Sequence, residues 1–239
     1  MVTHESHREA FVCHQRAVLA TLDPAFDPAL VSVSYLFHLG YAALLKSQFR
    51  PGHSVGVIGL GPIGLATLGM ASSGGGAAYA FSNQTNIADR ARQAGAIEVL
   101  SKDNHSAVPA LDIVVTTSNT WPDWQLALSA ARPGGTIAVL GFPGRGQPAP
   151  DFNPLASQFL YDKQLTVMAC GMLPNIDVSP TDVRFTVKRN MQWLVDQVGR
   201  ARLPAQHLVS EIAAADKLGD LYERLANREP GLVTAVLKW

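Results

Sequence analysis

The chain has 239 residues, of which 47% are hydrophobic, 19 are basic and 19 are acidic. This length suits one large α/β domain with a small appendage, and the apolar content is enough for a sizeable core. Without net charge, the composition gives no indication of a nucleic acid or an anionic membrane surface as a partner.

The N-terminus and the cysteines indicate a soluble, cytoplasmic protein. The opening residues MVTHESHREA are polar and mixed in charge, unlike a signal peptide. Cys13 and Cys170 lie far apart, as in a protein of a reducing compartment without a disulfide framework. His4, His7 and His14 stand in polar surroundings, so we interpret them as surface residues rather than metal ligands.

The first 50 residues predict two short strands and one helix. Ala10 to Cys13 and Ala17 to Thr21 are the strand candidates. Ala29 to Gln48 has too many apolar residues for a surface helix, so we expect a mostly buried helix. The turn Arg50-Pro51-Gly52 ends it.

The segment from Ser54 to Ser82 predicts a strand, a tight glycine turn, a helix and a second strand at Ala77 to Phe81. Within it, GLGPIG places Gly59, Gly61 and Gly64 at the spacing that lets a backbone lie against a pyrophosphate at a helix N-terminus. The alternative is an ordinary buried turn without a ligand. No charged residue occurs from Ser54 to Ile87, but Pro62 and the glycines argue against a membrane span.

Strands and helices continue to alternate along the chain, which predicts a doubly wound parallel α/β sheet. The expected helices are residues 86–94, 122–132 and 155–162, and the expected strands are residues 97–100, 111–117 and 136–140. The connection of residues 101–110 is too short for a full helix, so we expect one face of the sheet to be thinly covered.

The strand Leu165 to Gly171 is uncharged and is expected at the sheet edge, where unpaired backbone groups would bind a second copy. We therefore predict a homodimer. After it, a helix over 182–202, a strand over 208–212, a helix over 214–226 and a strand over 232–237 are expected. The side chains predicted to face inward from these helices are Phe185, Met191, Trp193, Leu194, Val198, Leu218, Leu221, Tyr222 and Leu225.

Several motifs in fixed order resemble the medium-chain dehydrogenase/reductase superfamily of the zinc alcohol dehydrogenase type. They are RPGHSVGVIGLGPIGLATLGMA, QAGAIEVL, ARPGGTIAVLGFPG, KQLTV and EPGLVTAVLKW. The resemblance implies a Rossmann domain over residues 51–180. Residues 1–50 and 181–239 would form a small remnant of the catalytic domain, drawn from both termini.

Members of that family begin with a GroES-like catalytic domain that carries zinc ligands, and this chain starts where that domain would be ending. The remaining family ligand, a Cys, Asp or Glu, would fall near Ser34 or Tyr35. Neither hydroxyl suits zinc, which takes thiolate, imidazole or carboxylate ligands. We therefore expect no metal.

The cofactor that the resemblance implies is a nicotinamide dinucleotide. The acid that usually holds the ribose 2′-OH at the end of the second strand is replaced by Ser82, followed by Asn83, Gln84 and Thr85. This favours NADP(H) over NAD(H), with Arg90 as the nearest basic residue. Alternatively, Ser82 only caps the next helix.

The family further implies that the pyrophosphate lies against Gly59, Gly61, Pro62, Ile63 and Gly64. The nicotinamide would meet the loops that follow the fourth and fifth strands. The residues of those loops are Thr116, Thr117, Ser118, Gly141, Phe142 and Pro143.

Tyr35, His38 and Tyr41 are the candidate catalytic residues, because their spacing places them near one helical face. A histidine beside a hydride acceptor can donate a proton. The alternative is a core histidine between core aromatic residues. Trp121 and Trp124 either pack under the next helix or form a wall of the substrate pocket.

Three functions remain open. The first is a zinc-independent NADP(H)-dependent oxidoreductase acting on a small carbonyl, enone or alcohol, its substrate a small molecule bound in an open cleft. The second is a non-redox isomerase or cyclase on a dehydrogenase scaffold. The third is a non-catalytic nucleotide-binding module or a fragment of a longer dehydrogenase.

Overall fold

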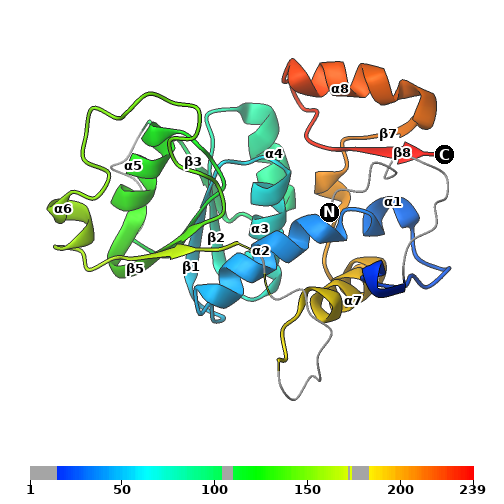
Figure 1. The fold of residues 1–239 in the computed structure, drawn as a ribbon, viewed down its shortest axis with the longest axis horizontal. Helices are drawn as coiled ribbons and strands as arrows, with labels where there is room; N and C mark the ends of the chain where they lie inside the picture. Colours follow the sequence, from blue (N-terminus) through cyan, green and yellow to red (C-terminus); the bar gives the residue numbers. More distant parts are fainter. Residues whose placement is uncertain (1–14, 104–109, 172, 174–182) are drawn as a thin grey trace.

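A six-stranded parallel sheet forms the centre of the fold in a computed structural model that describes residues 15–103, 110–171, 173 and 183–239 (Figure 1). The strands are β1 (Ser54–Ile58), β2 (Ala77–Phe81), β3 (Glu98–Leu100), β4 (Leu111–Thr116), β5 (Ala131–Val139) and β6 (Thr166–Ala169). Their order, β3-β2-β1-β4-β5-β6, reverses between β1 and β4. The predicted doubly wound Rossmann-type sheet is therefore confirmed, including the position of β6 at its edge.

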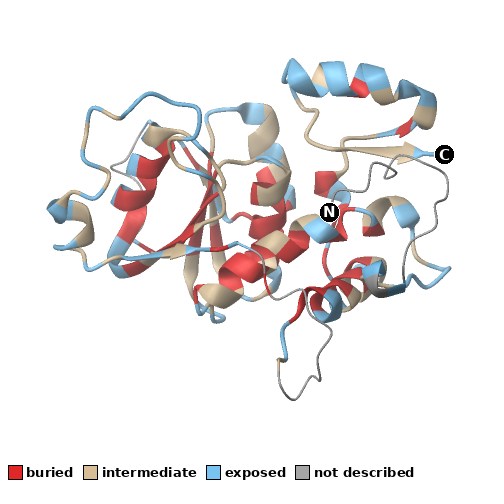
Figure 2. Ribbon diagram, viewed as in Figure 1, coloured by how far each residue is buried: buried red, intermediate tan, exposed pale blue. Residues whose placement is uncertain are grey.

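Helices cover both faces of this sheet. On one face lie α2 (Ser34–Lys46), α3 (Pro62–Ser73) and α4 (Thr85–Gln93), and their apolar side chains share a core cluster with β1 and β2. On the other face α5 (Trp121–Ala130) packs over Ile58, Leu111 and Ile137. The strands and these helices carry most of the buried residues (Figure 2). The described part of the connection between β3 and β4, residues 101–103 and 110, contains no helix.

The N-terminal segment differs from expectation in two ways. Residues 17–21 are not a strand: a short 3₁₀ helix, η1 (Gln15–Ala17), precedes an irregular segment. The other expected strand, Ala10 to Cys13, lies outside the described residues. The predicted helix over 29–48 is present, but it is divided into α1 (Pro28–Val31) and α2 by a turn at Ser32 and Val33.

One helical stretch in the described part of the chain, Pro28–Lys46, is long and apolar enough by composition to cross a membrane. Half of it is buried within the fold. Because α2 packs against both α3 and α7, this apolar character is that of a core helix.

The C-terminal segment forms α7 (Val187–Gly199) and a separate unit (Figure 1). That unit comprises a two-stranded parallel sheet of β7 (Glu211–Ala214) and β8 (Ala235–Lys238), with α8 (Leu218–Ala226) on it. Short 3₁₀ turns, η3 (Gln206–Leu208) and η4 (Ala215–Lys217), precede β7 and α8.

The predicted inward faces of α7 and α8 are only partly correct. Met191, Leu194 and Val198 are buried, as expected. Phe185 precedes the first residue of α7 and is 38% exposed, while Trp193 is 45% exposed and packs on Tyr41. On α8 only Leu221 is buried, because two strands offer too little surface to cover the whole apolar face. The partly exposed remainder of that face comprises Leu218, Tyr222 and Leu225.

A candidate dinucleotide-binding site

The turn between β1 and α3 requires glycine at two of its positions for different reasons. Gly59 has a φ of +91°, and a Cβ there would lie 2.6 Å from Thr117 Oγ1 and 2.9 Å from Ser118 N. A Cβ on Gly64 would collide with the carbonyl oxygen of Gly59. Thr117 also donates a hydrogen bond of 2.5 Å to that oxygen. The turn is therefore closely packed against the loop that follows β4.

Gly61, in contrast, faces open space. It is the N-cap of α3 with an ordinary φ of −79°, and a Cβ built on it meets no heavy atom within 4 Å. No side chain caps the helix, no acidic residue lies in its first turn, and the first helical residue is Pro62. Free amides and the positive end of the helix dipole therefore face an open cradle that suits a phosphate.

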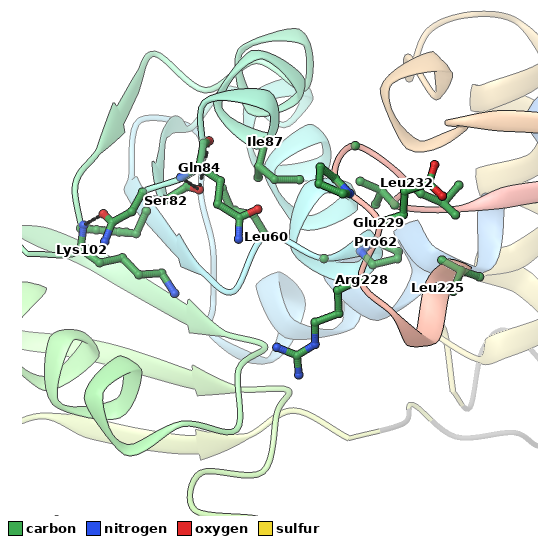
Figure 3. A pocket seen from close by; sticks show the side chains of 16 residues that line it. Leu60, Pro62, Ser82, Gln84, Ile87, Lys102, Leu225, Arg228, Glu229 and Leu232 are labelled. Carbon is green, nitrogen blue, oxygen red and sulfur yellow. Dashed lines mark hydrogen bonds between the residues drawn. The ribbon is translucent and has the colours of Figure 1, made fainter. Parts of the chain in front are cut away.

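This cradle opens into a cavity of about 730 Å³. Its walls come from two distant parts of the sequence (Figure 3). One wall contains Leu60, Gly61 and Pro62 together with residues 82–84 at the end of β2. The other wall is the segment 228–233, between α8 and β8. The cavity lies beyond the carboxyl ends of β1 and β2, next to the point where the strand order reverses, where open α/β sheets bind their ligands.

The residues after β2 form a hydrogen-bonded turn at one end of the cavity. Ser82 Oγ accepts a hydrogen bond from Gln84 N at 3.0 Å, so its hydroxyl supports the turn before α4. Asn83 Oδ1 accepts from Lys102 N at 2.8 Å, and its amide donates to Asp103 at 2.9 Å. These bonds connect the ends of β2 and β3.

Sequence reasoning missed two basic residues that line the cavity, Lys102 and Arg228. Lys102 lies two residues after the end of β3, so it was predictable from sequence, because the carboxyl ends of parallel strands lie at the same edge of a sheet. Its ammonium group also binds both carboxylate oxygens of Asp123, at 2.8 and 3.0 Å. Arg228 had no such signal, because only the folding of the C-terminal unit brings it to this site.

Arg90, predicted near a 2′-phosphate, binds protein groups in the structure. Its guanidinium donates to the carbonyl oxygens of His207 at 2.9 Å and Gly231 at 3.1 Å. It does not line the cavity but holds the C-terminal wall against α4. Arg224 stabilises the same wall, because it binds both Glu211 and Glu229.

The residues predicted at the nicotinamide end do converge. Leu140 N and Gly141 N both donate to Thr116 O at 2.9 Å, and a Cβ on Gly141 would strike the backbone of Ser118. Phe142, next in the chain, is 61% exposed, and Arg145 lies over its ring at 5.1 Å. Ile63, within α3, and Pro143 are both half-buried. The loops after β4 and β5 thus meet beside the glycine turn.

The candidate catalytic residues lie elsewhere on α2. His38 is fully buried, and neither ring nitrogen has a hydrogen-bond partner in the described structure. Its ring stacks on Tyr35 with 5.6 Å between centroids, and burial lowers the pKa of His38. Tyr41 packs against Phe185 and Trp193. None of the three lines the cavity, so proton donation by His38 stays a prediction.

The two tryptophans have different environments. Trp124 is on the buried face of α5, where it packs in the core. Trp121 lines a second cavity of about 330 Å³ with Phe152, and its indole donates to Pro148 O at 2.9 Å.

The described residues do not fit a zinc ion. In the described ranges, no three His, Cys, Asp or Glu side chains lie close enough to hold a metal. Ser34, where the family would supply a ligand, is buried in α2. Burial raises the pKa of the Cys170 thiol, which works against a thiolate ligand there.

Taken together, the sheet order and the glycine turn define a Rossmann-type fold, with a cavity beyond the ends of β1 and β2. No family model matches the chain. A curated sorbitol dehydrogenase from Bacillus subtilis (strain 168) is 21% identical over 198 residues, which cover 79% of this chain and 51% of the relative.

Solved structures of dehydrogenases are similar over most of the chain. An alcohol dehydrogenase from Thermus sp. ATN1 is 25% identical, with a TM-score of 0.72, over 92% of this chain and 61% of that protein. A putative zinc-binding dehydrogenase from Sinorhizobium meliloti 1021 bound to NADP is 18% identical (TM-score 0.67; 84% of this chain and 57% of that protein). A protein from E. coli CFT073 described as a short chain alcohol dehydrogenase, complexed with NADH, is 13% identical (TM-score 0.72; 92% of this chain and 62% of that protein).

These comparisons confirm the resemblance to zinc alcohol dehydrogenases of the medium-chain superfamily at the level of the fold. The chain spans about half to three-fifths of the length of these relatives.

Proposed function

We propose that the cavity beside the glycine turn binds a nicotinamide dinucleotide, and that the protein is an oxidoreductase acting on a small carbonyl, enone or alcohol. The observation that carries this proposal is the open cradle at Gly61, where the N-terminus of α3 faces a cavity of about 730 Å³. Similar structures bound to NADP and to NADH have the same fold, which supports the cofactor class.

Within this class we propose NADP(H) over NAD(H). Of the described residues that line the cavity, the only carboxylate is Glu229, and Arg224 binds it at 2.7 and 2.9 Å. The β2 end of the cavity instead offers Ser82, Gln84 and the ammonium group of Lys102. A 2′-phosphate there would meet the Ser82 hydroxyl and an ammonium group that already pairs with Asp123, and no unpaired carboxylate occurs among the described lining residues.

When bound, the dinucleotide supplies or accepts a hydride. The chain's own residues would bind and orient it: the turn at Gly59–Gly64 would hold the diphosphate. The joined loops after β4 and β5 lie beside that turn, outside the lining of the cavity, where the nicotinamide end would reach them. Phe142 is exposed at that end and provides an apolar surface for a small substrate. We propose that this reaction runs without zinc, because the described residues offer no suitable ligand set.

The test is a fluorescence titration of the purified protein with NADPH and NADH, accompanied by metal analysis. We expect both nucleotides to bind, with a lower Kd for NADPH, and no stoichiometric zinc. A panel of carbonyl and enone substrates then shows whether NADPH is consumed. Turnover of a substrate without consumption of NADPH would instead indicate a non-redox enzyme, and failure to bind either nucleotide would refute the proposal.

We also propose a homodimer joined through β6. Cys170 N donates to Val139 O, so by strand alternation the amides of Val167 and Ala169 point away from β5. The strand therefore presents a row of unpaired backbone groups, with Val167 43% exposed beside them. Such an edge pairs readily with a second copy.

A further inference from the structure

Arg228 has a backbone conformation that is unusual for its residue type. Its φ is +52°, in the left-handed region that favours glycine. Its N–H donates to Leu225 O at 3.1 Å, and the next amide, of Glu229, donates to Arg224 O at 3.0 Å. This pair of bonds closes the C-terminus of α8 in a Schellman motif, whose left-handed position is usually glycine. Gln48, Gln164 and Ala201 have the same left-handed conformation, so this geometry fixes where the Arg228 side chain starts and does not by itself mark function.

A second residue provides an internal comparison, because Gln48 closes α2 in the same way. Its φ is +54°, its N–H donates to Leu45 O at 3.1 Å, and Phe49 N donates to Leu44 O at 2.9 Å. Gln48 is exposed and lies outside the cavity. The two caps therefore share their backbone geometry and differ in what their side chains reach.

The side chain of Arg228 extends from the C-terminal wall into the opening of the cavity (Figure 3). In the described structure its guanidinium has no hydrogen bond or ion pair. The neighbouring carboxylate of Glu229 is bound to Arg224, and Lys102, at the other end of the cavity, is bound to Asp123. Arg228 therefore offers its full charge opposite the glycine turn.

We propose that Arg228 binds the diphosphate bridge of the dinucleotide from the side opposite the α3 amides. This inference rests on the proposed function. The amides at the glycine turn reach phosphate oxygens from one wall, and the planar guanidinium can bind the remaining oxygens in a bidentate manner from the other. Because the diphosphate is common to both nucleotides, Arg228 contributes equally to NADP(H) and NAD(H).

The test compares Arg228→Gln, which removes the charge but keeps a side chain, with Arg228→Gly and with the matched control Gln48→Gly. Kd values for NADPH and NADH are measured at low and at moderate salt, and unfolding temperatures are recorded for each variant. We expect both Arg228 variants to weaken binding of the two nucleotides about tenfold and to reduce the salt dependence.

Relief of backbone strain should raise the unfolding temperature of Arg228→Gly and of Gln48→Gly by about 2 °C, while Gln48→Gly binds both nucleotides as the parent protein does. If the parent binds and Arg228→Gln binds equally well, the role of Arg228 is refuted and the proposed function stands. Selective loss of NADPH would likewise overturn it, by placing Arg228 at the 2′-phosphate. If the parent protein binds neither nucleotide, both proposals fail.

Discussion

Three glycines of one turn carry three separate requirements. Gly59 is needed for its positive φ, Gly64 because the Gly59 carbonyl oxygen leaves no room for a Cβ, and Gly61 because a bound diphosphate would need the open space beside it. Only the last requirement concerns a ligand. Substitution at Gly61 can therefore separate binding from folding, whereas substitution at Gly59 or Gly64 cannot.

Gly61→Asp should abolish dinucleotide binding, with Kd rising by at least about 100-fold, because it places a carboxylate against the diphosphate. The fold should be as stable as before or more stable by a few tenths of a kcal/mol, since aspartate is a better N-cap than glycine. Titration with NADPH and urea unfolding measure the two effects. Gly61→Asn caps the helix without charge, so equal losses from both variants would show that bulk rather than charge is responsible.

His207 should make stability depend on pH. Burial lowers its pKa to about 4, whereas in the unfolded chain the pKa is near 6.5. The unfolded chain therefore takes up the proton first, and stability present above pH 6.5 is lost as the pH falls toward 4. We expect the free energy of unfolding to drop by about 2 kcal/mol from this residue between pH 7.5 and pH 5.

Urea unfolding of the parent and of His207→Gln at the two pH values measures this contribution. The variant should lose correspondingly less stability than the parent over the same interval. His38, whose pKa burial also lowers, contributes in the same direction in both proteins. Identical losses in the two proteins would show that His207 is not the titrating group.

At the scale of elements, α4 connects the sheet to the C-terminal wall of the cavity. Arg90 bridges from this helix to the carbonyl oxygens of His207 and Gly231. Arg92, two residues along the same helix, pairs among the described residues only with the exposed Asp89. Arg90 therefore connects α4 to the C-terminal wall, whereas Arg92 makes an ion pair at the surface. Substitutions at the two positions can be compared directly.

Arg90→Met should destabilise the protein by about 2 kcal/mol and weaken NADPH and NADH binding in parallel, because the wall at residues 228–233 loosens. Faster hydrogen exchange at the amides of these residues would report the loosening directly. Arg92→Met should leave stability and exchange nearly unchanged, as exposed pairs do. A selective loss of NADPH binding in Arg90→Met would instead support a contact with the 2′-phosphate.

Helices and strands that are delimited by short sequence patterns could be predicted from the sequence alone. Strand β2 was predicted with its observed bounds, and β1, β4 and the helices between them within a few residues, because continuous apolar runs and glycine turns delimit them. The walls of the cavity were only half predictable. Gly61 and Ser82 belong to a recognisable motif, whereas Arg228 reaches the site through the packing of the C-terminal unit. The exposure of Trp193 and Tyr222 could not be predicted from the sequence either, because it depends on how much of each helix the neighbouring elements cover.

At the scale of the whole molecule, the sheet has two different edges. β3 is short, with three residues, and its end is bonded to the turn at Asn83. β6 is largely exposed and presents its outer backbone groups to solvent. This asymmetry supports the proposed association through β6, which would join the two sheets in a closed pair of subunits rather than in an open-ended assembly.

Val167→Lys should convert the proposed dimer to a monomer, because two lysines would face each other near a twofold axis at the paired edges. Sedimentation or light scattering gives the mass, and circular dichroism should show an unchanged fold. The control is Ile212→Lys, on the exposed face of β7, where the side chain is 55% exposed. A parent protein that already runs as a monomer would contradict the proposal, as would a Val167→Lys variant that stays dimeric.

The cavity has walls from segments more than 150 residues apart in sequence, the turn at 59–64 and the segment at 228–233. Binding of the proposed dinucleotide in this cavity would therefore be thermodynamically linked to docking of the C-terminal unit. A dinucleotide held at a hundred times its Kd would add about 2.7 kcal/mol to the stability of the docked state. The bound dinucleotide would protect most against proteases that cut near α8. The rate of cleavage in this unit would therefore report the fraction of the protein that has dinucleotide bound.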